Sequence, residues 1–257
     1  VTPPKAKKRL IIANWKMYIE SPVAAKTFVQ GLKRKAPAFK GVDAWLAPSF
    51  TLLPLISPML KGGALRAGAQ AVSMHATGAH TGEISAPMLK QAGAAFALIG
   101  HSERRALGES NEAVHRSLIV AAQAGLSPVL CVGEAERTAD GAHFSVIEEQ
   151  LASALRGTQV FAGKLVVAYE PVWAIGKSAA DAMSADALEE TVIFIRKTLA
   201  GVLGRTEGLK VPILYGGSVE PDNAAALIAG GGVNGFLVGH ASAKLDSFVE
   251  ILKACKK

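Results

Sequence analysis

The chain has 257 residues, half of them hydrophobic, and a formal net charge of +7 at pH 7. This length and composition fit one large domain, and no apolar run approaches the roughly 20 residues that span a bilayer. The basic residues are not interleaved with aromatic ones, so we expect solvated surface charge and no nucleic-acid or membrane partner.

The N-terminal segment and the cysteines bear on the compartment. Residues 1–8 are basic and lack the apolar segment of a secretory signal, so we expect a poorly ordered extension before a domain that spans residues 9–257. Cys131 and Cys255 are the two cysteines, and there is no C-x-x-C motif. A disulfide framework or a zinc site is therefore not expected, and we predict a cytoplasmic protein without a metal ion or other cofactor.

Short apolar runs of the kind that form buried strands recur along the whole chain. The stretches between them are long enough for a crossover helix. The eight runs are Leu10–Ala13, Asp43–Leu46, Leu65–Gly68, Phe96–Ile99, Pro128–Val132, Leu165–Tyr169, Pro212–Tyr215 and Gly235–Val238.

Helical patterns fill the intervals between these runs. Hydrophobic residues recur at helical spacing over Phe144–Leu155 and Leu188–Leu199, and each set would pack one stripe on a layer of strands. Ser21-Pro22 fits an N-cap followed by a first helical residue. Gly93 and Gly125 stand where a helix should end before the next strand.

The strands are apolar almost throughout, which is typical of a parallel sheet that helices cover on both faces. An open doubly wound sheet and a closed barrel both satisfy this pattern. Eight units, and no G-x-G-x-x-G motif after the first strand, favour the barrel. We predict an α/β protein with a single (β/α)8 barrel, the TIM-barrel fold.

The active site of such a barrel lies at the carboxyl ends of the strands. Polar residues that follow the apolar runs should therefore converge on one mouth, where they would combine a base, an imidazole, a cation and anion-binding glycines. The candidates are Asn14, Lys16, Gln70, His101, Glu103, Glu134, Glu170, Gly216–Ser218 and Gly239.

These candidates lie in longer motifs, which together resemble the triosephosphate isomerase family from Leu10 to the C-terminus. The resemblance implies an isomerase that interconverts dihydroxyacetone phosphate and D-glyceraldehyde 3-phosphate through an enediolate, in glycolysis and gluconeogenesis, without a cofactor. Tyr169–Lys177 is the most specific motif. The matching stretches are Ala13–Met17, Gly78–Glu83, Ile99–Arg105, Leu130–Glu134, Ala168–Lys177 and Tyr215–Val219.

The resemblance implies that Glu170 takes a proton from the carbon next to the substrate carbonyl. The alternative is a carboxylate that caps a neighbouring strand. His101 would donate a hydrogen bond to the substrate oxygen as a neutral imidazole, although a histidine at a strand end is often structural. No role is implied for His80, His115 or His143.

Lys16 would offset the charge of the substrate phosphate and of the developing oxyanion. Asn14 would orient Lys16 or bind the substrate oxygen. Glu103 would be a hydrogen-bond partner of Lys16 and a proton shuttle. An ion pair between Glu103 and Arg104 or Arg105 is equally open from the sequence.

Glycines after the seventh and eighth strands stand where barrels commonly bind phosphate, although a turn without a ligand is the alternative. We expect the phosphate site to contain Ser218, Gly239 and His240, joined by Gly176, and Tyr215 to latch a lid over it. The predicted lid consists of Pro171, Val172, Trp173, Ala174, Ile175, Gly176 and Lys177.

The sequence departs from the family pattern at three places. His240 follows Gly239 where the family usually has a second glycine, Ala71 stands where it often has asparagine, and residues 106–110 are one residue short. The Gly78–Glu83 motif is intact, and the resemblance implies that Thr81 reaches into the site of a partner subunit. We therefore expect a homodimer.

The sequence argues against two other classes of function. An inactive barrel kept for phosphometabolite binding or for interactions predicts the loss of Glu170, His101 or Lys16, and all three are present. A phosphate-binding barrel isomerase from aromatic amino-acid synthesis would lack the Tyr169–Lys177 motif. The sequence therefore favours triose phosphate isomerisation.

Overall fold

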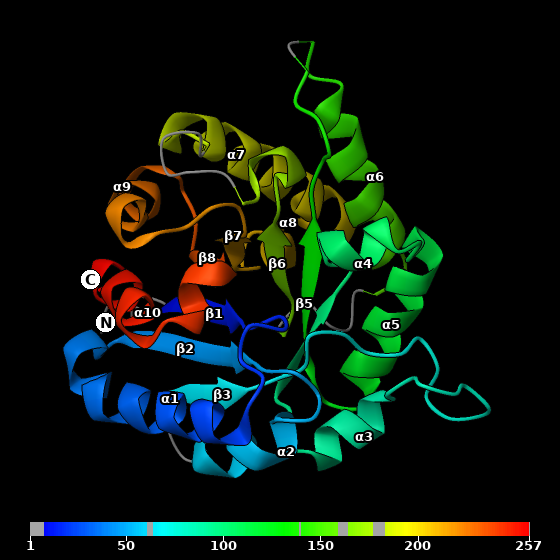
Figure 1. The fold of residues 1–257 in the computed structure, drawn as a ribbon. Coiled ribbons are helices and arrows are strands. Elements are labelled where there is room, and N and C mark those ends of the chain that lie inside the picture. Colours follow the sequence, from blue (N-terminus) through cyan, green and yellow to red (C-terminus); the bar gives the residue numbers. More distant parts are fainter. Residues whose placement is uncertain (1–7, 61–63, 139, 159–163, 177–182, 257) are drawn as a thin grey trace, which may run out of the picture.

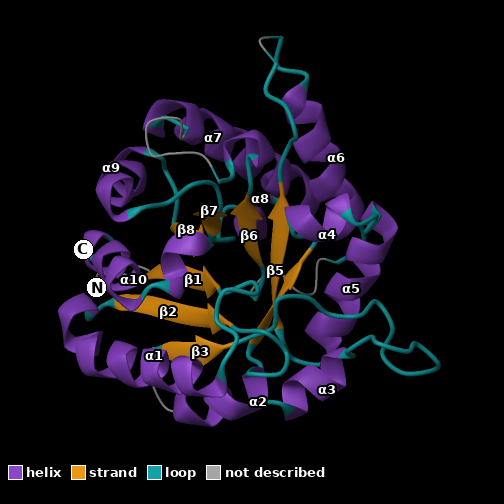
Figure 2. Cartoon of the chain, in the orientation of Figure 1, coloured by secondary structure: helices purple, strands orange, loops and turns teal. Residues whose placement is uncertain are grey.

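The computed structural model describes residues 8–60, 64–138, 140–158, 164–176 and 183–256. Strands and helices alternate along it, and the helices surround the strands (Figures 1 and 2). Residues 1–7 of the predicted basic extension lie outside the described residues. Lys8 is described, and its ammonium lies 3.4 Å from Asp43 Oδ1.

Eight parallel strands form one sheet in the order β3-β2-β1-β8-β7-β6-β5-β4. The two end strands also meet, because the Ala69 N–H donates to Phe96 O at 2.9 Å and the Ala95 N–H donates to Ala67 O at 2.8 Å. The sheet is therefore a closed barrel, and the open alternative is excluded. The strands are β1 (Arg9–Asn14), β2 (Val42–Ala47), β3 (Leu65–Ala67), β4 (Phe96–Ile99), β5 (Ser127–Val132), β6 (Val166–Tyr169), β7 (Ile213–Tyr215) and β8 (Gly235–Val238).

All eight predicted strands are confirmed to within one residue at each end. The helices also begin and end where the cap residues predict. Ser21 Oγ accepts the Ala24 N–H at 3.0 Å at the start of α1. Gly93 and Gly125, with φ of 89° and 78°, follow the last turns of α3 and α5.

The helices are α1 (Pro22–Lys35), α2 (Leu53–Ile56), α3 (Ala86–Gln91), α4 (Ser102–Ala106), α5 (Asn111–Gln123), α6 (His143–Leu155), α7 (Ala185–Leu203), α8 (Arg205–Gly208), α9 (Pro221–Gly230) and α10 (Leu245–Ala254). Short 3-10 turns include η1 (Ala36–Phe39), η2 (Ser57–Leu60), η4 (Val172–Ala174) and η6 (His240–Ala243). None of the helices in the described part is long and apolar enough to cross a membrane.

Alternate residues of each strand enter two separate cores, since side chains point to opposite faces of a strand. One set packs between the strands and the helices, and a smaller set fills the barrel interior. β3 presents Gly68 inward, because a Cβ there would lie 2.4 Å from the Phe96 ring. The interior set is Leu10, Ile12, Trp45, Ala47, Phe96, Leu98, Val129, Cys131, Val166, Ala168, Leu214 and Leu237.

The same alternation selects which residues line the carboxyl-end mouth. Asn14, Glu170, Gly216 and Gly239 each lie two residues beyond an interior residue of their own strand. Their inward direction therefore follows from the period of the strands that hold them.

Candidate active site

Glu170 follows β6 and is almost completely buried, with 2% of its surface exposed. Its Oε2 accepts the Ser102 N–H at the start of α4 at 2.8 Å. Its Oε1 is buried and has no hydrogen-bond donor among the described residues, and lies 3.3 Å from His101 Nε2. One carboxylate oxygen is thus fixed, while the other is available to accept a proton.

Two glycines make room for this carboxylate. A Cβ on Gly133 would lie 1.8 Å from the Glu170 carbonyl oxygen, and a Cβ on Gly216 would lie 2.9 Å from Glu170 Cγ. Real Cβ atoms do not come that close to backbone, so residue 133 has to be glycine for β5 and β6 to end as they do. The position of Glu170 therefore depends on the neighbouring strands.

His101 turns inward because Gly100, with φ of 70°, breaks the alternation at the end of β4. The imidazole caps α4, and its Nδ1 accepts the Glu103 N–H at 3.2 Å. A ring nitrogen that accepts a hydrogen bond carries no proton, so a neutral ring holds its proton on Nε2. That nitrogen lies 3.3 Å from Asn14 Nδ2 and faces the cavity that Glu170 also lines.

Asn14 and Lys16 form a rigid pair at the end of β1. Asn14 Oδ1 accepts the Lys16 N–H at 3.1 Å, and Gln70 Nε2 donates to the Lys16 carbonyl at 2.9 Å. Lys16 has φ of 45°, a positive value that among the described non-glycine residues occurs only here. A side chain in this region of φ is strained, so these bonds hold Lys16 in a conformation that its backbone would otherwise avoid.

The Lys16 ammonium donates to Glu103 Oε1 at 2.8 Å. Burial alone would raise the pKa of Glu103, but the hydrogen bond and the charge of Lys16 outweigh it and hold that pKa below its ordinary value. The pair therefore adds stability above the ordinary carboxyl range and loses it as the pH falls through the folded-state pKa. Pairing with Arg104 or Arg105 is not observed, and the guanidinium of Arg105 donates to Gly100 O and Asn111 Oδ1.

Glu170, His101, Asn14 and Lys16 share one cavity of about 380 Å³ with the predicted phosphate loops, whereas Glu103 lines a smaller cavity beside it. Among the described residues, Lys16 is the only lysine or arginine that lines this cavity. Its Nζ lies 3.7 Å from the position that a Cβ on Gly239 would occupy. The lining residues are Asn14, Lys16, Tyr18, His101, Glu170, Ile175, Gly176, Gly216–Glu220, Leu237 and Gly239–Ala241. Acid, imidazole, ammonium and glycine loops thus meet around a space the size of a small ligand.

Comparisons with known proteins agree with this geometry. The family model for triosephosphate isomerase matches residues 9–255. The chain is 41% identical to the triosephosphate isomerase of Carboxydothermus hydrogenoformans over 250 residues, covering 96% of this chain and 98% of that one. It is 40% identical to that of Aquifex aeolicus, covering 95% and 98%. The crystal structure of triosephosphate isomerase from Bartonella henselae superposes with a TM-score of 0.83 at 34% identity, covering 96% and 98%.

The chain belongs to the triosephosphate isomerase family. It is an isomerase that interconverts dihydroxyacetone phosphate and glyceraldehyde 3-phosphate in glycolysis. The substrate therefore carries one phosphate and one carbonyl. The ammonium and glycine loops of the cavity are complementary in charge to the phosphate, and its imidazole and amide can donate to the carbonyl oxygen.

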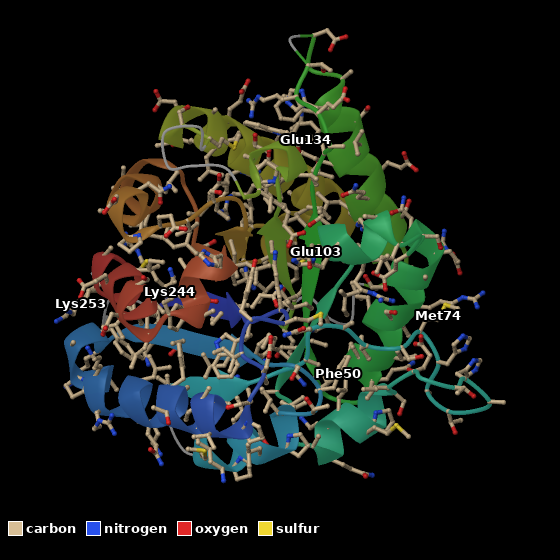
Figure 3. All side chains as sticks on the ribbon, viewed as in Figure 1. Phe50, Met74, Glu103, Glu134, Lys244 and Lys253 are labelled. Carbon is tan, nitrogen blue, oxygen red and sulfur yellow. The ribbon has the colours of Figure 1, made fainter. Side chains whose placement is uncertain are left out.

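One of the predicted mouth residues lies elsewhere. Glu134 does not line the cavity: it is buried, and its Oε1 accepts the Tyr169 hydroxyl and the Trp173 indole N–H, each at 2.8 Å. Figure 3 shows Glu134 well apart from Glu103. Gln70 does lie at the mouth: it lines a smaller cavity there together with Asn14, Lys16 and His101, and it donates to the Lys16 carbonyl. The prediction that Glu134 converges on the mouth was wrong, because Glu134 shares the outward direction of Val132.

The bonds to Glu134 fix the first part of the predicted lid. Pro171 precedes η4, the Val172 N–H donates to Glu134 O at 3.0 Å, and Ala174 is buried. Ile175 and Gly176 line the cavity, whereas Lys177 lies outside the described residues.

The loop from β3 to α3 projects away from the barrel and carries Thr81 (Figure 1). Thr81 is exposed and takes no part in the cavity of its own chain. Sequence reasoning missed the support that Ser102 gives to Glu170, because the donor is a backbone N–H and does not depend on the side chain.

Proposed function

We propose that Glu170 is the base of the isomerisation. Its free Oε1 takes a proton from the carbon next to the substrate carbonyl, and the same carboxylic acid returns a proton to the adjacent carbon. The observation that carries this assignment is the buried Oε1 without a donor, 3.3 Å from His101 Nε2 and on the wall of the cavity. A positioned base of this kind contributes about 10²–10⁴-fold to the rate.

His101 donates its Nε2 proton to the substrate oxygen as the enediolate forms. The Glu103 N–H on Nδ1 supports this role, because it selects the tautomer that has a proton to donate. Asn14 Nδ2 lies 3.3 Å from the same nitrogen and is a second donor for the same substrate oxygen.

Lys16 balances the negative charge of the phosphate and of the enediolate. Its strained backbone and its bond to Glu103 support this role, since both hold the ammonium at the cavity before substrate binds. Glu103 positions Lys16 and is the candidate to exchange a proton with it.

The phosphate binds between Gly176, Ser218, Gly239 and His240. Glycine leaves the backbone N–H groups open to close approach by an anion. Pro171–Lys177 closes over the bound substrate with Trp173 held on Glu134, which excludes water from the enediolate. Tyr215 serves as the latch.

The protein is a homodimer of the cytoplasm in this proposal. Met17 and Leu107 are 86% and 78% exposed, which is costly for large apolar side chains unless a partner covers them. Thr81 of the projecting loop reaches the site of the partner. Both cysteines are buried and free, as suits a reducing compartment. A fully active monomer in light scattering at micromolar concentration would refute the dimer.

A coupled assay of glyceraldehyde 3-phosphate isomerisation tests the site. We expect Glu170→Ala to lower kcat by about 10²–10⁴-fold with little change in KM. Lys16→Ala should raise KM as well, because it removes a charge that acts on the bound ground state. Equal rates for wild type and Glu170→Ala would rule out the assignment of the base.

A further inference from the structure

A second cavity, of about 960 Å³, opens at the amino-terminal end of the barrel, opposite the active site. Its floor is apolar and includes Leu10, Trp45 and Val166, which are the first interior residues of β1, β2 and β6 in the barrel core. The packed interior of the barrel therefore separates the two cavities.

Positive charge surrounds this amino-terminal cavity. Six basic residues line it against two acidic ones, Asp43 and Glu207. They come from distant parts of the sequence, so the cluster is a product of the fold. The basic residues are Lys8, Arg66, Lys90, Lys164, Arg196 and Lys210.

Arg66 occupies an inward-facing position of β3, while Lys8 and Lys164 lie just before β1 and β6. Lys8 precedes Leu10 by two residues, Lys164 precedes Val166 by two, and Arg66 precedes the inward Gly68 by two. Interior positions of such a barrel are normally bulky and apolar. Cations directed at one opening repel each other, and this repulsion is relieved when an anion binds between them.

Some of these basic side chains already have a partner within the protein. Lys8 lies near Asp43, Lys210 pairs with Glu207 at 2.7 Å, and Lys90 donates to Gly125 O at the end of α5. Arg196 donates to Leu209 O at 3.4 Å, and partial burial lowers the pKa of its guanidinium.

Arg66 and Lys164 differ from the other cations. Neither forms an ion pair or a hydrogen bond with any residue that the structure describes, whereas Lys90 and Arg196 each donate to a backbone carbonyl. The Arg66 guanidinium lies over the Trp45 ring, 5.3 Å from its centre, and the side chain is exposed. The guanidinium is planar, and its exposed side is free to stack on a planar ligand.

We propose that this cavity binds a nucleoside di- or triphosphate. The base stacks on the outer face of Arg66 above the apolar floor, and the phosphates contact Lys164 and the basic residues next to it. The volume lies within the range of pockets that hold ligands of this size. The site is separate from the triose phosphate site, so both ligands bind to one chain together.

Calorimetric titration of the whole protein with ATP, in the presence of saturating triose phosphates, tests the proposal. We expect one ATP per chain, binding that weakens as salt is added, and affinity at least about tenfold higher than for tripolyphosphate or adenosine alone. Absence of binding would overturn the proposal. Equal affinity for tripolyphosphate would overturn the stacking of a base, and competition with triose phosphate would place ATP at the active site instead.

Variants locate the binding. Arg66→Ala and Lys164→Ala should each weaken ATP binding about tenfold and leave isomerase activity unchanged, since each removes one charged contact. Arg66→Lys retains the charge without the planar group, and should lose part of the preference for ATP over tripolyphosphate. The matched control is Lys26→Ala, which removes one exposed charge from α1, outside the lining of this cavity. An equal loss of affinity in this control would show that only net charge matters and would overturn the site.

Discussion

Replacing Gly216 by alanine tests how finely the base is positioned. The new Cβ would lie 2.9 Å from Glu170 Cγ, whereas carbon atoms pack at about 3.5–4.0 Å. The carboxylate of Glu170 must therefore shift by about 1 Å, and a misplacement of this size costs about 10²-fold in rate. The backbone of Gly216 does not have a positive φ, so alanine can adopt its conformation, and its Cβ would also lie 3.3 Å from the Tyr169 carbonyl oxygen.

Catalysis and stability should respond differently to Gly216→Ala. The crowded atom belongs to a side chain that can move, so we expect a stability loss of only about 1–3 kcal/mol. The coupled assay should show kcat lowered about 100-fold, with a much smaller change in KM. Gly201→Ala is the matched control, because a Cβ there meets nothing within 4 Å in α7. It should keep full activity and gain about 0.5–1 kcal/mol. A kcat for Gly216→Ala within about threefold of wild type would refute the reasoning.

Three further predictions concern other parts of the molecule. Burial raises the pKa of both thiols, to about 12 for Cys255, and the charge of Glu170 adds to the effect at Cys131. A thiol reagent at pH 8 should therefore label neither cysteine in the folded protein and both after unfolding. Relative to His240→Gly, wild type should bind substrate more weakly, because the imidazole adds bulk to the wall of the cavity; identical affinities from about pH 5.5 to 8 would remove this role. Trp173→Phe deprives a buried carboxylate of one donor and should cost about 1.5–3 kcal/mol in urea unfolding, and an unchanged midpoint would contradict it.

Much of the fold could be predicted from the sequence because its signals are local. Each strand is buried on both faces and so reads as an apolar run, and caps such as Ser21 act on the adjacent turn. Closure of the barrel was harder to predict from the sequence. It depends on hydrogen bonds between β3 and β4 that no local pattern encodes.

The site could be predicted only in part. A residue that follows a strand can point its side chain into the barrel or away from it, and its place in the sequence after the strand does not by itself say which. Glu170 and Glu134 both follow apolar strands, yet Glu170 shares the inward direction of Ala168 and Glu134 the outward direction of Val132. Counting alternate residues back from each carboxylate would have separated them. The strained φ of Lys16 has no such signal, because it results from tertiary bonds to its backbone.

Proton exchange with solvent measures the central step directly. Dihydroxyacetone phosphate is incubated in D2O with wild type or with Glu170→Gln, and deuterium at the carbon next to the carbonyl is followed by NMR. We predict that wild type incorporates deuterium rapidly, while Glu170→Gln still binds the substrate but incorporates it about 10²–10⁴-fold more slowly. Incorporation at the wild-type rate by Glu170→Gln would show that another group removes the proton.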